Sequence, residues 1–308
     1  MKLAFLYAGQ GSQHAGMGAD LYEAYPAFRE AFDAAELSFD LHEVCFSDPR
    51  GELGMTQYTQ PCMVAFAAGV TAVLRENGIV PAYAAGLSLG EYSALQAAGV
   101  FTAKSAVELA AYRGSAMAEA AKGRESAMTA VLNLDEQALA RCCEEASALG
   151  VVQICNYNCP GQLVIGGDKA AVARAGELAM AAGARRCMPL RVSGPFHTEL
   201  MRPAANALAA RFETEAFGEM AFPVLFNCLG DLKGEENIAQ LLVRQVHSGV
   251  RMESIIRRLG ELGVDTIVEI GPGKALTGFV RKTLGTAITC LSAEDVPSLQ
   301  ATLAALKG

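Results

Sequence analysis

The hydrophobic positions in the first third of the chain alternate between two periods. Continuous apolar runs at residues 3–7 and 79–85 have the length of buried strands. Helical spacing follows the first run at 21–32 and the second at 91–98, and another helix is predicted after Thr102. A further apolar run at 62–74 predicts a buried helix, which Thr59 and Pro61 would open. The order indicates an α/β fold with a parallel sheet core.

The middle of the chain has a different order of predicted strands and helices. It predicts two helices, at 135–148 and 168–182, and four strands, at 127–132, 151–157, 163–165 and 186–192. Strand, helix, strand, strand, helix, strand is the order of a ferredoxin-like unit. We therefore expect a small ferredoxin-like domain at residues 124–192, inserted into a large α/β domain formed by residues 1–123 and 193–308.

After the predicted insert the α/β alternation resumes. Strands are predicted at 223–228, 266–270 and 287–291, and helices at 199–214, 236–247, 251–262, 274–284 and 295–306. The large domain is expected to be α/β-hydrolase-like, with a ligand cleft where it meets the insert.

Composition and charge exclude several classes of protein. The 308 residues are 52% hydrophobic and 19% charged, as in a globular protein, and the net charge of −8 gives no general attraction for nucleic acid. The nine cysteines form no CxxC pair, which favours reduced, buried thiols over disulfides or a metal site. Because no apolar run resembles a membrane span or a secretory signal, we expect a cytoplasmic protein.

The first candidate for chemistry is Ser88. Residues 86–90 read GLSLG, the Gly-x-Ser-x-Gly pattern of a nucleophile elbow, between a predicted strand and a predicted helix. Gly86 and Gly90 lack a Cβ, so the backbone can turn sharply and hold the hydroxyl at the start of the helix. The pattern is short, however, and leaves open an ordinary turn with a capping serine.

A serine nucleophile needs a base, and the sequence contains four histidines. His42 lies in a polar stretch and His247 at a predicted helix end, so both are expected to be structural. His14 follows a glycine-rich loop and remains ambiguous. His197 lies in the turn GPFHT at the exit of the predicted insert, which makes it the favoured base.

Two glycine-rich loops lack the residues that a nucleotide site needs. The loop GQGSQ at 9–13 has His14 where a dinucleotide site needs glycine, and GPGK at 271–274 lacks the other residues of a phosphate loop. No cofactor is therefore expected. The first loop could instead provide one backbone N–H of an oxyanion hole, with the N–H of Leu89 as the other.

Arg113 lies in a predicted helix of small and apolar residues. It could end the helix facing water or point into a site, and composition alone favours the exposed position, because charged residues are usually solvated.

Eight motifs occur in order along nearly the whole chain: GQGSQ at 9–13, TQP at 59–61, GLSLGEYSAL at 86–95, RG at 113–114, NxNxPGQ at 156–162, GPFHT at 194–198, Gln245 and EIGPG at 269–273. Together they resemble the malonyl-CoA:acyl carrier protein transacylases of bacterial type II fatty acid synthesis. The family usually has proline and histidine where this chain has Ala8 and Leu87, which predicts a slightly looser first loop and a different packing of the elbow.

The resemblance implies a role for each matching residue. Ser88 would be the acyl-accepting nucleophile and His197 its base, with Gln245 orienting the imidazole in place of a carboxylate. Arg113 would hold the malonyl carboxylate. The backbone amides of Gln10 and Leu89 would form the oxyanion hole, and neither a metal nor a cofactor would take part.

The implied partners are malonyl-CoA and an acidic, phosphopantetheinylated acyl carrier protein. Six basic residues are candidates for docking the carrier: Arg185, Arg186, Arg191, Lys274, Arg281 and Lys282. Three alternatives remain open, namely a malonyltransferase that serves a polyketide synthase, a serine hydrolase of acyl thioesters, and a carrier-binding scaffold without activity.

Overall fold

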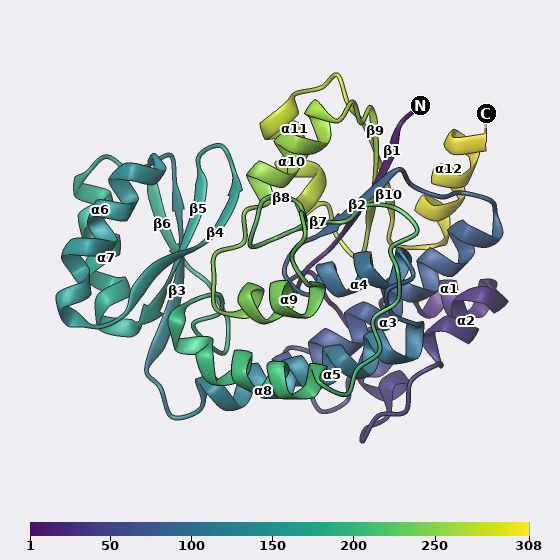
Figure 1. Ribbon diagram of the computed structural model, residues 1–308, viewed down its shortest axis with the longest axis horizontal. Coiled ribbons are helices and arrows are strands. Elements are labelled where there is room, and N and C mark those ends of the chain that lie inside the picture. The colour runs from purple at the N-terminus through teal and green to yellow at the C-terminus, as the bar shows by residue number, and fades with distance from the viewer. Residues whose placement is uncertain (308) are drawn as a thin grey trace. The chain divides into compact units, whose positions relative to one another are not determined.

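A computed structural model describes residues 1–307 (Figure 1). The chain divides into two compact units. The first comprises Met1–Ser115, Ala216–Phe226 and Arg257–Gly308, and the second comprises Ala116–Glu215 and Asn227–Ile256. The predicted insert at 124–192 falls within the second unit, which also includes residues on both sides of it. The boundaries of that insert as a separate domain stay a prediction.

The first unit is built on a parallel sheet with the strand order β10-β9-β1-β2. Its strands are β1 (Leu3–Tyr7), β2 (Tyr83–Gly86), β9 (Thr266–Ile270) and β10 (Thr289–Ala293). Every residue of β1 and β9 is buried, as expected for strands covered on both faces, and both have the predicted bounds. The strand predicted from residue 79 starts only at Tyr83, because Pro81 has no N–H to donate to a ladder.

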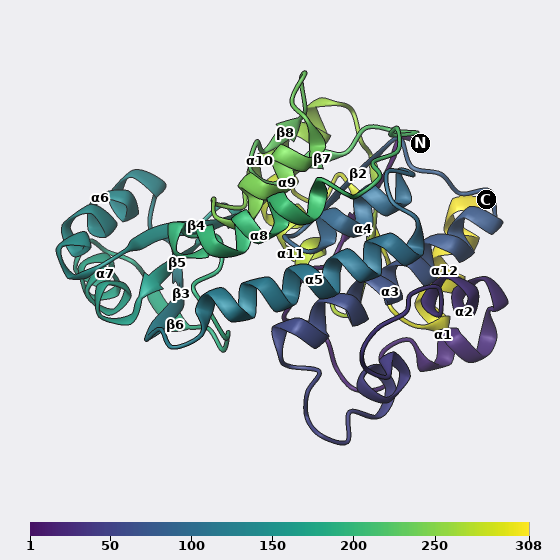
Figure 2. The same cartoon turned by 60° about the horizontal axis from the view of Figure 1, so that its bottom comes forward.

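Helices cover this sheet on both faces (Figure 1). The helices that lie wholly in the first unit are α1 (Ala19–Ala24), α2 (Pro26–Phe32), α3 (Thr56–Glu76), α4 (Gly90–Ala97), α11 (Ala275–Leu284) and α12 (Val296–Lys307), with a π-helix at Glu43–Ser47. Helix α4 contacts β1 and β2, and α3 packs against both α4 and α2 (Figure 2). The helix predicted over 21–32 is interrupted at Tyr25, which is extended because Pro26 follows it.

The start of α3 corrects another prediction. Thr59 and Pro61 are predicted to open the helix, but α3 begins at Thr56, and Pro61 lies inside it. The Thr59 hydroxyl is no N-cap; it donates to the main-chain oxygens of Leu53 at 2.5 Å and Met55 at 3.1 Å. These bonds and the burial of the helix outweigh the hydrogen bond that proline cannot make.

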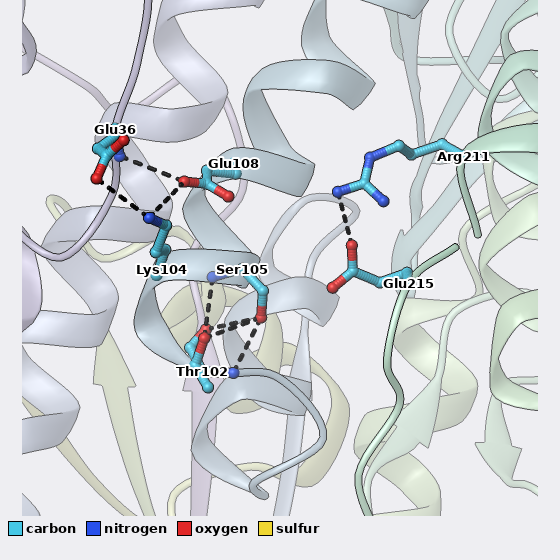
Figure 3. A network of polar contacts seen from close by, with 7 residues as sticks. All are labelled: Glu36, Thr102, Lys104, Ser105, Glu108, Arg211 and Glu215. Carbon is cyan, nitrogen blue, oxygen red and sulfur yellow. Dashed lines mark hydrogen bonds and ion pairs between the residues drawn. The ribbon is translucent and has the colours of Figure 1, made fainter. Parts of the chain in front are cut away.

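Helix α5 (Ala103–Ala121) begins at a reciprocal cap (Figure 3). The Thr102 N–H donates to Ser105 Oγ, and the Ser105 N–H donates to Thr102 Oγ1, each at 3.0 Å. In the same turn, Lys104 Nζ lies 3.3 Å from Glu36 Oε1 and 3.8 Å from Glu108 Oε1 (Figure 3). These contacts fix the beginning of the helix that carries Arg113.

The second unit contains an antiparallel sheet with the strand order β4-β5-β3-β6. Its strands are β3 (Ser126–Leu132), β4 (Val152–Cys159), β5 (Gln162–Asp168) and β6 (Arg186–Pro189), and its helices α6 (Glu136–Ala146) and α7 (Lys169–Ala181) pack together against it (Figure 1). The predicted order of strands and helices is confirmed. Val131, Leu139, Ile165 and Ala175 belong to the core between the sheet and the two helices.

The remaining elements are three helices and four short segments. They are 3-10 turns at Ser147–Leu149 and Glu199–Met201, helices α8 (Arg202–Phe212), α9 (Ile238–Val246) and α10 (Met252–Glu261), and strands β7 (Leu225–Phe226) and β8 (Asp231–Leu232). All nine cysteines are free thiols, and seven of them are buried. None of the helices within residues 1–307 has the length and apolar character needed to cross a membrane.

Candidate active site

Ser88 lies at the sharp turn between β2 and α4. Its φ is 54°, in the left-handed region that non-glycine residues rarely adopt. Gly86 ends the strand, and a Cβ there would collide with the carbonyl carbon of Gly90. A Cβ on Gly90 would collide in turn with the main-chain oxygen of Tyr7. Both glycines are therefore required for close packing, and the turn has the strained strand-to-helix geometry of a nucleophile elbow.

The loop at 9–13 lies against this elbow. A Cβ built on Gly9 would be 2.6 Å from the main-chain oxygen of Leu87, and the Leu87 N–H donates to Tyr7 O at 2.9 Å. The Leu87 side chain also faces this loop, since its Cγ would be 3.2 Å from the same built Cβ. Within residues 1–307, neither the Gln10 nor the Leu89 backbone N–H donates to a protein acceptor. Both amides are thus available to an oxyanion.

Arg113 is buried beside Ser88, with 1% of its surface exposed. Its Nη2 donates to Ser88 Oγ at 3.0 Å and its Nη1 to Gln60 Oε1 at 2.8 Å. The guanidinium carbon lies 5.5 Å from the centre of the Tyr92 ring, and burial lowers the pKa of Arg113. The exposed position that composition favours is therefore wrong, because specific partners compensate the burial of this charge.

Gln60 was not recognised as a functional candidate from the sequence. It is 1% exposed on α3, and its carbonyl oxygen accepts from Arg113. Gly114 lets the two helices approach, since a Cβ there would be 2.7 Å from Thr56 O. The signal that could have identified Gln60 is its position in the TQP motif, which predicted only a helix start.

Replacing Gln60 by leucine should raise the KM for malonyl-CoA, the substrate that the resemblance implies, about 10-fold or more, because a hydrogen bond to a charged group contributes about 1.5–3 kcal/mol and Nη1 would lose the Gln60 oxygen. Steady-state kinetics would measure the change, with thermal unfolding as a check on folding. Gln300→Leu, at an exposed position of α12, is the matched control. An unchanged KM in a folded Gln60→Leu protein would contradict a role in orienting Arg113.

His197 also has a left-handed backbone, with a φ of 61°, and is 4% exposed. Its Nδ1 lies 2.9 Å from the main-chain oxygen of Gln245. A carbonyl oxygen can only accept, so the proton of this hydrogen bond is on Nδ1. Gln245 thus contacts the imidazole through its backbone, in the last turn of α9.

The segment around His197 is held in place within the second unit. The Thr198 hydroxyl donates to Pro195 O at 2.6 Å, and the Glu199 N–H donates to Gln153 Oε1 at 2.7 Å. Gly194 is packed closely, because a Cβ there would lie 2.7 Å from the Cβ of Ala121. These contacts fix the main chain on both sides of the strained histidine.

The other three histidines have structural surroundings or are exposed. His42 pairs with Asp33 at 2.8 Å among aromatic rings, and His247 at the end of α9 lies 3.4 Å from Glu199 Oε1. His14 is exposed and contacts the oxygen of Ala15. Among residues 1–307, no group of three or more acidic, cysteine or histidine side chains could hold a metal ion.

The structure assembles the predicted residues in two groups. In the first unit, Ser88 and Arg113 are hydrogen-bonded and the free amide of Leu89 follows the serine; in the second unit, His197 contacts Gln245. Of the non-glycine residues within 1–307, four have a positive φ, and Ser88 and His197 are two of them. Such strain persists only where surrounding structure enforces it, and it concentrates at functional sites. The first group can position an acyl acceptor beside a cation, and the second can accept a proton.

Comparison with known proteins identifies acyl transferases as the class of protein that this chain resembles. The acyl transferase domain family matches residues 4–306. The malonyl CoA-acyl carrier protein transacylase of Bacillus subtilis (strain 168) is 41% identical, over 99% of this chain and 98% of that protein. The crystal structure of the corresponding transacylase from Clostridium perfringens Atcc 13124 superposes with a TM-score of 0.96 at 37% identity, covering 100% of this chain and 98% of the other.

A second solved structure is a type II PKS acyl-carrier protein in complex with its malonyl-transacylase. Its matching chain has a TM-score of 0.94 and 40% identity, covering 99% of this chain and 100% of the other. This chain therefore belongs to the acyl transferase domain family.

Proposed function

We propose that this chain is a malonyl-CoA:acyl carrier protein S-malonyltransferase of fatty acid biosynthesis. The observation that carries the proposal is the 3.0 Å hydrogen bond between a buried guanidinium and the elbow serine. A cation so close to the nucleophile can reach the carboxylate of a three-carbon acyl group on Ser88. Malonyl would be selected over acetyl because an uncharged acyl group cannot pair with the desolvated Arg113.

In the first half-reaction, Ser88 Oγ attacks the thioester carbonyl of malonyl-CoA while His197 Nε2 accepts the hydroxyl proton. The N–H groups of Gln10 and Leu89 stabilise the negative oxygen of the tetrahedral intermediate. The C–S bond then breaks, and the coenzyme A sulfur leaves with the proton from His197. The product is a malonyl-serine ester whose carboxylate binds Arg113.

The second half-reaction reverses this sequence with another thiol. His197 takes the proton of the phosphopantetheine thiol of the carrier, and the sulfur attacks the malonyl-serine ester. The bond between the malonyl carbonyl carbon and Ser88 Oγ breaks, and Oγ recovers the proton from His197. Because the first product leaves before the second substrate reacts, the kinetics should be ping-pong, and no cofactor is needed.

Finer features of the fold belong to the same proposal. We assign the first unit to the α/β-hydrolase-like class, supported by the elbow between β2 and α4. Residues 124–192 would form an inserted ferredoxin-like domain, supported by the strand order β4-β5-β3-β6. We place the protein in the cytoplasm, where nine free thiols would remain reduced.

The carrier would dock on basic surface residues. The six candidates are all exposed, namely Arg185, Arg186 and Arg191 in the second unit and Lys274, Arg281 and Lys282 in the first. In the second unit the arginines are interspersed with the exposed apolar side chains of Met188, Leu190 and Val192. This mixture of positive charge and apolar surface suits an acidic carrier protein.

The test is a two-step labelling experiment. Malonyl-CoA alone should add a malonyl group to the peptide that contains Ser88, as measured by mass spectrometry after digestion. Adding the phosphopantetheinylated carrier should remove this label and load the carrier, and higher salt should slow that second step. Release of malonate in place of carrier loading would indicate a hydrolase. Carrier binding without any labelled serine would indicate a scaffold.

A further inference from the structure

Two carboxylates hold the loop at 271–274, which connects β9 to α11. Glu269, at 1% exposure, accepts from the N–H groups of Leu276 at 2.9 Å and Thr277 at 2.8 Å. Glu294, after β10, accepts from the Gly273 N–H at 2.7 Å. The loop is thus fixed at its centre by one carboxylate and at its helical end by the other. Such hydrogen bonds to an ionised acceptor are among the stronger ones in proteins.

The fixed loop packs against the loop at 9–13. A Cβ on Gly271 would collide with the Cβ of Ala8, and a Cβ on Gly273 would be 3.5 Å from that of Ser12. The Ala8 N–H donates to Ile270 O at 3.0 Å, which extends the pairing of β1 with β9 by one bond. Proline at this position could not make that bond. Ala8 therefore attaches the start of the loop to the neighbouring strand β9 through a hydrogen bond that proline would lack.

Gln10 lies between these two contacts, one at Ala8 and the other at Ser12. Its backbone N–H can serve an oxyanion only if the loop holds it steady, and glycines at positions 9 and 11 give the loop little stiffness of its own. Two side chains of the loop contribute support, because the Gly11 N–H donates to Gln13 Oε1 at 2.7 Å and Gln10 Nε2 donates to Thr56 Oγ1 at 3.1 Å. Further support comes from residues 270–273, which Glu294 holds directly and Glu269 holds from the helix side.

We propose that Glu294 and Glu269 are positioning residues for the oxyanion loop, acting through the segment 271–273 on the backbone amide of Gln10. This inference rests on the proposed transferase function. Neither carboxylate touches the reacting atoms, so their effect is on the placement of an oxyanion donor. Loss of a donor costs about 10²–10³ in kcat, and partial misplacement should cost less.

Glu294 is the better position to test, because it is partly exposed whereas Glu269 is buried, so substitution is less harmful to folding. Glu294→Ala removes the acceptor of the Gly273 N–H. Glu294→Gln retains a carbonyl oxygen of the same reach. Glu30→Ala, at an exposed position of α2, is the matched control.

Rapid-quench measurement of Ser88 malonylation would separate the acylation rate from the affinity for malonyl-CoA. Glu294→Ala should lower the acylation rate about 10-fold with an unchanged half-saturation concentration. Glu294→Gln should recover most of the rate, and Glu30→Ala should match the unmodified protein. Thermal unfolding would confirm that each variant is folded at the assay temperature.

Three results would overturn the inference: an unchanged acylation rate in Glu294→Ala, a loss confined to the half-saturation concentration, or a Glu294→Gln variant as slow as Glu294→Ala. Failure of the proposed function would be seen in the unmodified protein itself. In that case the unmodified protein would form no malonyl-serine ester, and there would be no acylation rate for the variants to change.

Discussion

Replacing Ser88 by alanine is expected to abolish carrier loading, with a loss of about 10³-fold or more and up to about 10⁶-fold, because the acyl group would have no acceptor. His197→Ala should retain the acceptor but lose the base, which lowers the acylation rate by about 10²–10⁴-fold. Loading of the carrier can be followed by its mass change. Labelling by a fluorophosphonate should fail completely in the serine variant and slow markedly in the histidine variant.

Ser93→Ala is the matched control for the serine variant. Ser93 is a buried serine on α4, the helix that follows Ser88, so its replacement tests whether the loss comes from perturbing that helix. It should load the carrier at close to the normal rate. Retention of more than a tenth of the activity in Ser88→Ala would rule out the covalent mechanism.

Arg113→Ala should change the specificity for the acyl group, because Arg113 would bind the malonyl carboxylate and take no part in proton transfer. The kcat/KM for malonyl-CoA is expected to fall about 10²- to 10³-fold, because the malonyl carboxylate would enter a buried site without its cation. The kcat/KM for acetyl-CoA should rise, since the alanine variant no longer presents a desolvated guanidinium to an uncharged acyl group. Parallel assays with both thioesters would give the ratio.

Arg113→Lys separates charge from geometry. A lysine ammonium keeps the charge but not the planar pair of nitrogens that bind Gln60 and Ser88 at the same time. The variant should therefore retain a preference for malonyl at a reduced rate. If the ratio of kcat/KM for malonyl-CoA to that for acetyl-CoA were unchanged in a folded Arg113→Ala protein, another group would have to bind the carboxylate.

The sequence predicted elements well where burial alone decides them. The strands at 3–7 and 266–270 have the predicted bounds because each is buried along its whole length in a parallel sheet. The elbow at Ser88 was predictable because the positions two residues before and after it accept only glycine, which leaves a recognisable pattern in the sequence. Boundaries at proline were less certain, as Pro61 inside α3 shows, since tertiary packing can outweigh a local preference.

The environment of Arg113 could not be read from composition. Its acceptor Gln60 lies 53 positions earlier in the chain, and only the packing of α3 against α5 at Gly114 joins them. The contact between His197 and Gln245 spans 48 positions and uses a main-chain atom, for which no sequence pattern exists. Long-range partners of this kind depend on the assembled fold, whereas motifs show only which side chains are available.

The main-chain oxygen that orients His197 has an evolutionary consequence. A point mutation at position 245 changes the side chain but leaves the carbonyl in place, so drift at this codon cannot delete the acceptor. An insertion or deletion within α9 would turn that oxygen away, because each added residue rotates a helix by about 100°. Selection on the orientation of the imidazole should therefore preserve the length of this helix.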